Sequence, residues 1–291
     1  MDLILKNKVA IITGGNQGFG LEVAKEYLKA GASVSLCARN ESLLSKVSED
    51  LRLLATSDQK ILSIKTDVSK ENDVHNFVAK TIKEFGKIDI LVNNAGVYGP
   101  KGSIEEVEWS SWVHAIEINL FGSILMCRTV LPFFRQQGYG KIIQLSGGGA
   151  TNPMPNISAY AVSKAAIVRF IETLAEEVSE FKIDVNAIAP GALNTRMLNE
   201  ILAAGPEKVG QLFYKKSVIQ KESGGAGFEC GTALAVFLAS DLSNGITGKL
   251  ISAIWDNWES WPIHLAELQD SDVYTLRRIT GRDRNYNWGD K

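Results

Sequence analysis

A tyrosine and a lysine, Tyr160 and Lys164, stand four residues apart inside a strongly helical segment. At this spacing two side chains lie one turn apart on the same face of a helix. A free tyrosine has a pKa of about 10, so acid–base chemistry near neutral pH requires that pKa to fall by about 3 units. A nearby lysine ammonium lowers it, because it favours the phenolate. The pair therefore predicts a proton-transferring tyrosine, although an ordinary helical pair has the same spacing.

Further polar residues accompany two of the predicted strands. The segment Asn93–Gly96 follows one strand, Ser146 ends the next, and Asn119 lies in the middle of the helix between them. The carboxyl ends of the strands form the edge at which open α/β sheets bind ligands. We therefore expect Asn119, Ser146, Tyr160 and Lys164 to converge on one crevice.

A glycine-rich segment, Thr13–Gly20, follows the first predicted strand and opens the first predicted helix. Its glycines at 14, 18 and 20 let the backbone turn tightly and approach a pyrophosphate, to which the helix N-terminus offers free N–H groups. The Lys-Ser/Thr pair of a triphosphate-binding loop does not follow Gly20. The position after the first strand favours a dinucleotide site, with a tight turn that holds no ligand as the alternative.

The end of the second predicted strand indicates which dinucleotide binds. An NAD site carries an acidic residue here for the ribose 2′-hydroxyl, whereas an arginine accommodates the 2′-phosphate of NADP. The segment Leu36–Asn40 contains Arg39 and no acidic residue. Because arginine pairs with phosphate through two hydrogen bonds, NADP(H) is favoured over NAD(H), with a solvated surface arginine as the alternative.

Short apolar runs alternate with longer helical patterns along the chain, and these segments predict the strands and helices that position the site residues. Seven apolar or β-branched runs predict strands: Val9–Ile12, Ser33–Cys37, Ile61–Lys65, Ile88–Val92, Lys141–Leu145, Ile183–Ala187 and Lys249–Ser252. Helical patterns lie between them: Gly20–Ala30, Ser42–Ala55, Glu71–Phe85, Trp109–Gln136, Ser158–Glu180 and Glu229–Ala239. This alternation predicts an α/β fold, a single Rossmann-like doubly wound domain with a seven-stranded parallel sheet flanked by helices.

Two regions depart from the alternation. Pro190–Gly227 is punctuated by glycine and proline and has only a short apolar helix near Met197–Ala204, so we expect a mobile substrate lobe at about 191–227. After residue 254 no further βαβ unit follows, and this stretch holds four of the six tryptophans. A typical α/β domain has about 250 residues, so the residues after 254 exceed the length of one such domain. We therefore divide the chain into a Rossmann domain, 1–254, and a C-terminal extension, 255–291.

Composition excludes several other classes of protein. A net charge of −2 argues against general polyanion binding, and apolar stretches such as Thr232–Ala239 are shorter than the ~20 residues that span a bilayer. The N-terminus, Met1–Lys8, lacks the apolar region of a secretory signal. Three widely spaced cysteines and no metal-ligand spacing predict a cytoplasmic protein without a metal site. We expect no nucleic-acid or membrane partner.

Together the motifs resemble those of the short-chain dehydrogenase/reductase family over about residues 6–253. The resemblance rests on four patterns: Thr13-Gly14-x3-Gly18-x-Gly20, Asn93-Asn94-Ala95-Gly96, Tyr160-x3-Lys164 and Pro190-Gly191. It implies an oxidoreductase that interconverts a carbonyl and a secondary alcohol of a small molecule by hydride transfer with a nicotinamide cofactor.

The resemblance also implies a role for each site residue. Ser146 would hydrogen-bond the substrate oxygen, Tyr160 would exchange a proton with that oxygen, and Lys164 would lower the pKa of Tyr160 and hold the nicotinamide ribose. Asn119 would position Lys164 through a water and its own backbone. The implied cofactor contacts are Gly14, Asn16, Gln17, Gly18, Phe19, Gly20, Arg39, Asp67, Val68, Asn94, Ala95, Gly96, Tyr160, Lys164, Pro190, Gly191, Leu193 and Thr195. A homodimer or homotetramer is implied as well, since the helices that carry Asn119 and Tyr160 commonly pair across two-fold axes.

Two features depart from the family pattern. Gly147–Gly149 after the serine predict either room for a bulky or polar substrate or simply a flexible turn. The chain continues beyond Ile254–Trp258, where relatives commonly end in a Val-Asp-Gly-Gly-like sequence. The extension is either an amphipathic appendage packed on its own or a neighbouring subunit, or a source of arginines and tryptophans that reach the crevice.

Two other functions stay open at this level. One is a cofactor-binding regulatory or scaffold protein with vestigial activity. The other is an enzyme that modifies a nucleotide sugar, against which Arg39 and the small lobe weigh.

Overall fold

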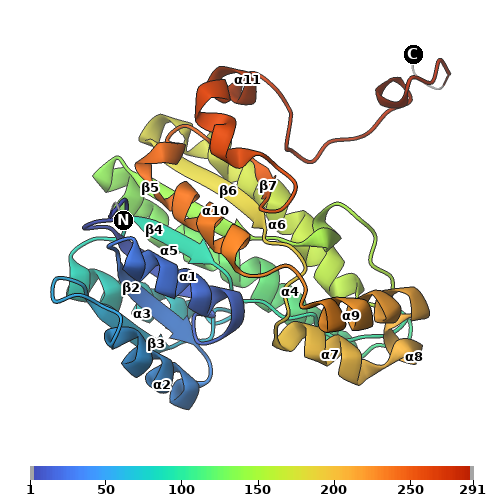
Figure 1. The fold of residues 1–291 in the computed structure, drawn as a ribbon, viewed down its shortest axis with the longest axis horizontal. Coiled ribbons are helices and arrows are strands. Elements are labelled where there is room, and N and C mark those ends of the chain that lie inside the picture. Colours follow the sequence, from blue (N-terminus) through green and yellow to red (C-terminus); the bar gives the residue numbers. More distant parts are fainter. Residues whose placement is uncertain (1–2, 289–291) are drawn as a thin grey trace.

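A seven-stranded parallel sheet forms the centre of the computed structural model, which describes residues 3–288 (Figure 1). The strands are β1 (Val9–Thr13), β2 (Ser33–Ala38), β3 (Ile61–Lys65), β4 (Ile90–Asn93), β5 (Gly140–Leu145), β6 (Ile183–Ala189) and β7 (Leu250–Ser252). Their order in the sheet is β3-β2-β1-β4-β5-β6-β7, so the chain reverses its direction of winding between β1 and β4. At such a point a crevice opens beyond the carboxyl ends of the strands. The predicted fold class is confirmed.

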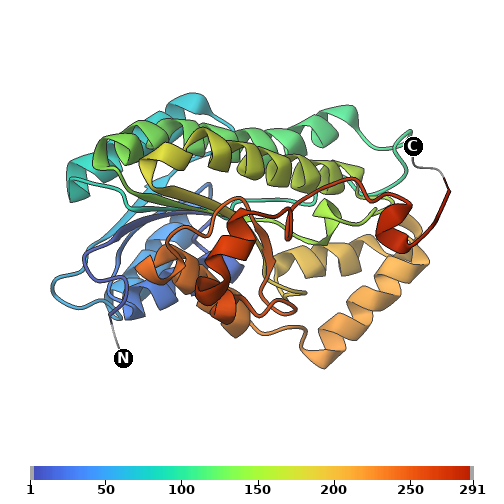
Figure 2. The same ribbon diagram turned by 90° about the horizontal axis from the view of Figure 1, so that it is seen from above.

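Helices cover both faces of this sheet (Figure 2). One face carries α1 (Gly18–Lys29), α2 (Glu41–Arg52) and α10 (Glu229–Ala239), and the other carries α3 (Glu71–Phe85), α5 (Gly122–Gln137) and α6 (Ser158–Glu177). Each face has its own hydrophobic core. Because both faces are covered, β1 and β4 are buried at every residue, which explains why each is apolar up to its last residue.

One continuous helix runs from Trp109 to Gln137 through α4 (Trp109–Ile116), a π-helical turn (Glu117–Phe121) and α5. By length and composition alone this helix could cross a membrane, so the expectation that every apolar stretch is too short was wrong here. In the fold its buried side chains, among them Met126 and Phe134, belong to the core under the sheet. Packing in that core accounts for the apolar character of these buried side chains.

The lobe between β6 and α10 contains three helices, where the sequence predicted only one. They are α7 (Arg196–Ala204), α8 (Pro206–Val209) and α9 (Gln211–Ser223). The third has no apolar stripe to reveal it, because Leu212 and Ile219 are exposed and Ser217 is its one buried residue. Ile201 and Val209 instead form a small separate core with Ile157.

The first part of the extension packs on its own chain. Trp258 and Trp261, in a 3-10 helix (Trp258–His264), and Leu268, in α11 (Leu265–Gln269), join the core on the α1/α10 face. The Trp258 ring lies 5.2 Å from the ring of Phe237 on α10. The appendage interpretation therefore holds for this segment.

The chain then crosses the outer edge of β7. The Leu250 backbone N–H donates to the Tyr274 carbonyl at 2.8 Å, and Lys249 Nζ donates to the carbonyls of Ser271 and Val273 at 3.1 Å. Leu276 then packs against the core on the α3/α5/α6 face. The extension thus covers an edge strand whose backbone groups would otherwise stay unpaired.

Candidate active site

The glycine loop joins β1 to α1 and lines one part of a cleft. Gly14 and Gly18 have positive φ angles of 64° and 55°, in the left-handed region that favours glycine. Gly20 differs, because a Cβ there would lie 2.7 Å from the Gly14 carbonyl and would also meet the Asn94 amide. Gly20 is not among the residues that line the cleft, and its missing side chain allows close packing of α1 on the loop.

Hydrogen bonds hold the end of β4 to this loop. The Thr13 hydroxyl accepts from the backbone N–H groups of Asn94 and Ala95 at 3.0 Å each. In return Asn94 Nδ2 donates to the carbonyls of Thr13 at 2.8 Å and Gly14 at 3.1 Å. Thr13 belongs to the glycine motif, yet the sequence analysis assigned it no role.

The cleft has a volume of about 930 Å³ and lies beyond the carboxyl ends of the strands. It brings together nearly all the predicted site residues: Gly14, Asn16, Gln17, Gly18, Phe19, Arg39, Asp67, Val68, Asn94, Ala95, Gly96, Ser146, Tyr160, Lys164, Pro190, Gly191, Leu193 and Thr195. Asn119 does not line it. Its side chain instead pairs with the backbone of Val97, through bonds of 2.8 Å to both N and O, and donates to Ser163 Oγ at 3.0 Å.

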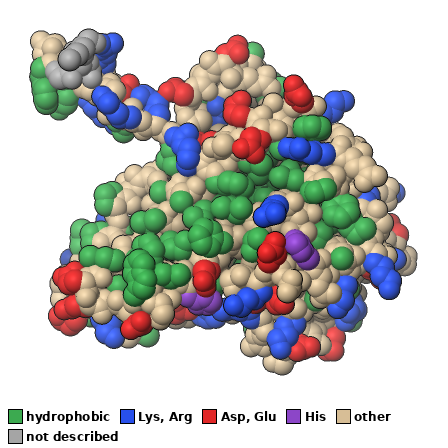
Figure 3. All heavy atoms as spheres, turned by 180° about the vertical axis from the view of Figure 1, so that it is seen from behind, with side chains coloured by type: hydrophobic (Ala, Val, Ile, Leu, Met, Phe, Trp, Pro, Cys, Tyr) green, Lys and Arg blue, Asp and Glu red, His purple; other side chains and the backbone are tan. Residues whose placement is uncertain are grey.

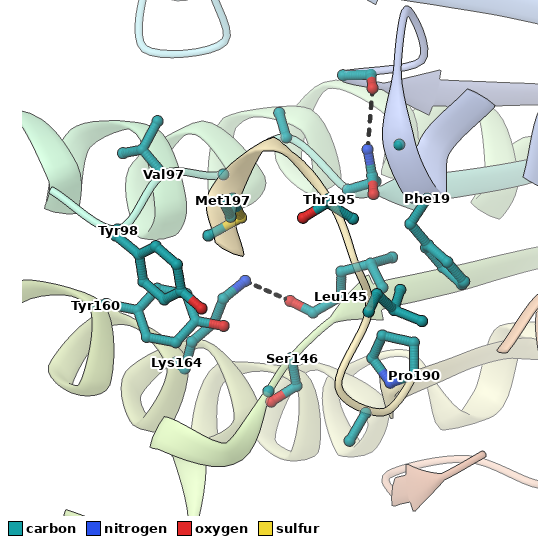
Figure 4. A pocket seen from close by; sticks show the side chains of 18 of the residues that line it. Phe19, Val97, Tyr98, Leu145, Ser146, Tyr160, Lys164, Pro190, Thr195 and Met197 are labelled. Atoms are coloured by element: carbon teal, nitrogen blue, oxygen red, sulfur yellow. Dashed lines mark hydrogen bonds between the residues drawn. The ribbon is translucent and has the colours of Figure 1, made fainter. Parts of the chain in front are cut away.

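Ser146 and Tyr160 lie in the cleft with Lys164 (Figure 4). The Ser146 hydroxyl is buried and has no hydrogen-bond partner within residues 3–288, although buried polar atoms are nearly always paired. Beside it, a Cβ on Gly147 would lie 2.5 Å from the Tyr160 hydroxyl oxygen. The glycine after the serine therefore leaves the space that the tyrosine hydroxyl uses, an effect the sequence analysis missed.

The pKa of Tyr160 is raised in this structure, not lowered as expected. Burial, and then the neighbouring Tyr98, raise the pKa of Tyr160, because a low-dielectric site favours the neutral phenol. Lys164 is buried as well, which lowers its pKa to about 8. Its Nζ donates to the Leu145 carbonyl at 2.7 Å and lies 5.6 Å from the centre of the Tyr160 ring. Burial therefore keeps Tyr160 a neutral phenol near pH 7.

A second tyrosine, Tyr98, forms the wall beside Tyr160. The two ring centres are 4.7 Å apart with their planes inclined by 60° (Figure 4). Burial raises the pKa of Tyr98 to about 12, so it also stays neutral. Tyr98 follows the Asn-Asn-Ala-Gly motif by two residues, but only the tertiary structure reveals its contact with Tyr160.

The opposite end of the cleft contains Arg39 and Asp67. Although burial favours the neutral acid, hydrogen bonds from Ser69 and the nearby Arg39 cation keep the pKa of Asp67 below its usual value. Arg39 is exposed at the tip that follows β2, on the rim of the cleft. A cation at this place suits a phosphate group.

The residues present fit a nicotinamide dinucleotide. The glycine turn leaves backbone room for a pyrophosphate beside the N-terminus of α1. At the other end the unpartnered Ser146 hydroxyl and the buried Lys164 ammonium offer polar groups to a ribose and a substrate. The cleft of about 930 Å³ joins these two ends.

The lobe and the extension supply the remaining walls. Met197, Phe213 and Ser217 come from the lobe, and Trp255, Tyr274 and Thr275 come from the extension. Of the arginines and tryptophans that the extension offers, Trp255 lines the cleft, whereas none of the described arginines after residue 254 does. Arg277, for example, pairs with Asp272 and Asp283.

The histidines and cysteines form no metal site in the described part of the chain. Residues 3–288 contain no group of three or more metal-binding side chains. His75, His114 and His264 each lie beside a glutamate on the surface. The three cysteines are free thiols.

Comparisons with known proteins agree with this site. The family model for the short chain dehydrogenases matches residues 8–205. The chain is 33% identical over 246 residues to "Dehydrogenase/reductase SDR family member 4" of Caenorhabditis elegans, covering 84% of this chain and 93% of that protein. It is 37% identical over 190 residues to "11-beta-hydroxysteroid dehydrogenase-like 3" of Arabidopsis thaliana, covering 65% of this chain and 60% of that longer protein.

A solved structure shares the architecture. The crystal structure of levodione reductase superimposes with a TM-score of 0.76 at 30% sequence identity, covering 85% of this chain and 96% of that one. With the family match, the glycine loop and the serine–tyrosine–lysine cleft, this shows that the chain belongs to the short-chain dehydrogenase/reductase family, whose members bind NAD(P) and oxidise or reduce alcohols and carbonyls.

Proposed function

We propose that the protein is an NADP(H)-dependent oxidoreductase that interconverts a carbonyl and a secondary alcohol of a small molecule. The observation that carries the proposal is the unpartnered Ser146 hydroxyl in the same cleft as Tyr160, Lys164 and the glycine loop. A scaffold protein would have no need of a buried, unsatisfied hydroxyl at this place.

Each of these residues has a definite task in the proposed reaction. Ser146 donates a hydrogen bond to the substrate oxygen, and Tyr160, a neutral phenol, gives that oxygen its proton during reduction. The Lys164 ammonium stabilises the phenolate left behind, and Asn119 positions Lys164 indirectly, since it donates a hydrogen bond to the hydroxyl of Ser163, the residue before Lys164 on α6. The bound dinucleotide supplies or accepts the hydride.

Turnover with a panel of carbonyl compounds tests this proposal. We expect NADPH oxidation by the wild type and a loss of at least a hundredfold in kcat/KM for Tyr160→Phe, since the proton donor contributes about 10²–10⁴. Tyr139→Phe is the matched control, because Tyr139 lies outside the cleft. Tight NADPH binding without turnover on a broad panel would instead support the vestigial scaffold.

We propose NADP(H) rather than NAD(H) as the cofactor because Arg39 stands on the cleft rim near Asp67. Arg39→Ala should weaken NADPH binding by at least tenfold and leave NADH binding within about twofold, as expected when one charged hydrogen-bonding partner is lost. Arg52→Ala, at the other end of α2, should change neither affinity. An equal loss for both cofactors refutes the assignment to the 2′-phosphate.

We further propose that the chain forms a homodimer or homotetramer through the face of α5 and α6. Hydrophobic side chains gather on the face seen from behind (Figure 3). Trp109 on α4, Phe121 in the π-helical turn before α5 and Val162 on α6 are 66%, 51% and 49% exposed. Patches of this kind mark interfaces between subunits. Sedimentation as a monomer at micromolar concentration would contradict this. The free thiols agree with a cytoplasmic location, which we also propose.

A further inference from the structure

The last described part of the extension leaves the body of the protein. This C-terminal arm, residues 277–288, projects beyond the domain (Figure 1), and none of its residues is buried. Ile279 and Trp288 are 58% and 71% exposed, and the Trp288 ring stacks on Tyr286 at 5.9 Å. The arm carries four arginines and one aspartate. It is therefore a basic segment whose large apolar side chains have nothing to cover them.

A second cavity of about 560 Å³ has the complementary character. This Glu-rimmed groove lies on the α1/α10 face, with an apolar floor that includes Val236, Phe237 and Trp258. Its rim carries three glutamates: Glu26, Glu229 and Glu259. Glu26 pairs with Lys29 at 2.6 Å, whereas Glu229 and Glu259 have no ion pair within residues 3–288. Ile4 and Leu242 at the edge are exposed, so apolar surface continues out of the groove.

The arm starts on the opposite face of the sheet from its own groove. Leu276, where the arm begins, packs against the α3/α5/α6 core, and its N–H donates to Glu172 on α6 at 2.6 Å. Arg169 on α6 also donates to the Leu276 carbonyl. The sheet and its helices separate this anchor from the groove. We infer that the C-terminal arm of one copy docks in the Glu-rimmed groove of a second copy.

Charge and apolar area both favour this pairing. Tryptophan, tyrosine and arginine are the residues that contribute most at protein interfaces, and the arm supplies all three. Arg278 and Arg284 of the arm meet the two rim glutamates, Glu229 and Glu259, while Ile279 and Trp288 cover the apolar floor and edge. Because the groove lies on the opposite face of the sheet from α5 and α6, this contact adds to an assembly built on the α5/α6 face.

Binding of a peptide that corresponds to the arm tests the inference. The probe is a fluorescein-labelled peptide of residues 277–291, and the receptor is a chain that ends at Leu276, whose core is intact because no described arm residue is buried. We expect saturable binding of one peptide per chain, weakened at least tenfold by Glu229→Lys/Glu259→Lys. The matched control, Glu49→Lys/Asp50→Lys on α2, should leave it within about twofold. The full-length protein, whose groove holds an arm, should bind the peptide at least tenfold more weakly.

Sedimentation of the intact protein provides a second measurement. Arg278→Glu/Arg284→Glu in the full chain should lower the mass of the assembly, and combining it with the groove reversals should restore that mass. Absence of saturable peptide binding overturns the inference. Peptide affinity that is unchanged by Glu229→Lys/Glu259→Lys overturns it as well. Equal affinity of full-length and shortened chains also overturns it, since the groove would then be free for a basic segment of another protein.

Discussion

Removing the buried ammonium of Lys164 should stabilise the protein while it abolishes the proposed activity. Lys164 is buried, and no acidic partner neutralises its charge within the described residues; its one hydrogen bond is to the Leu145 carbonyl. Methionine has a similar length and no charge. The substitution Lys164→Met therefore separates the cost of burying this charge from its use in catalysis.

The size of the effect follows from the lysine pKa. Burial lowers it from 10.5 to about 8, which corresponds to a cost of about 3 kcal/mol when the amine is charged, since one pKa unit is about 1.4 kcal/mol. Loss of the hydrogen bond between Lys164 and the Leu145 carbonyl offsets about 1 kcal/mol of this gain in stability. The carbonyl keeps one partner, because Gln144 Nε2 donates to it at 3.1 Å. We expect Lys164→Met to raise the free energy of unfolding by about 2 kcal/mol at pH 7.

The pH dependence distinguishes this cause from better packing. Between pH 8 and 10.5 the unfolded wild type holds more protons than the folded one, so its free energy of unfolding rises with pH. The free energy of unfolding of Lys164→Met lacks this dependence on pH. The excess of its unfolding free energy over that of the wild type should therefore shrink by about 2 kcal/mol from pH 7 to pH 9.5.

Urea unfolding at both pH values and at a fixed protein concentration measures this excess. Lys46→Met, at an exposed lysine of α2, is the control and should change stability by less than about 0.5 kcal/mol. A Lys164→Met protein that is less stable than the wild type at pH 7, or equally stabilised at both pH values, would refute the reasoning.

Three other substitutions have definite expected outcomes. Gly147→Ala puts a Cβ 2.5 Å from the Tyr160 hydroxyl and should lower kcat/KM by about a hundredfold with cofactor affinity unchanged. Gly148 has open space around it, so the kcat/KM of Gly148→Ala should stay near that of the wild type. Steady-state kinetics of both variants measure this difference. Trp258→Ala should cost about 3–5 kcal/mol in urea unfolding, and the exposed Trp255→Ala less than about 0.5 kcal/mol, so equal losses would contradict the packing of the extension. Lys141→Ala removes the partner, at 2.6 Å, of a largely buried aspartate and should lower stability by about 3–5 kcal/mol; a loss below 1 kcal/mol would show that water already screens the pair.

The sheet and most of the cleft could be predicted because their signals are local. A glycine turn between a strand and a helix, a tyrosine one turn before a lysine, and apolar runs at strand spacing are each legible within a few residues of the chain. The parallel sheet then brings the carboxyl ends of its strands together, so Gly14, Ser146 and Tyr160 meet in one cleft.

Helices and contacts that the local sequence does not indicate could not be predicted. Helix α9 has no apolar stripe, because the lobe buries few of its side chains, and its pattern is that of a loop. Gly20 belongs to the motif, but only the structure shows that it also leaves room for Asn94, which depends on how closely α1 approaches the end of β4.

The sequence by itself determined the fold class, the family and the residue types that could transfer a proton. Only the tertiary structure decided that burial and Tyr98 keep Tyr160 neutral, that Gly147 makes room for its hydroxyl, and that the extension crosses the edge of β7 to reach the cleft with Tyr274. The physical reason is that a pKa, a steric gap and a packing route depend on neighbours far apart in the chain, whereas secondary structure and turn motifs depend on neighbours close along it.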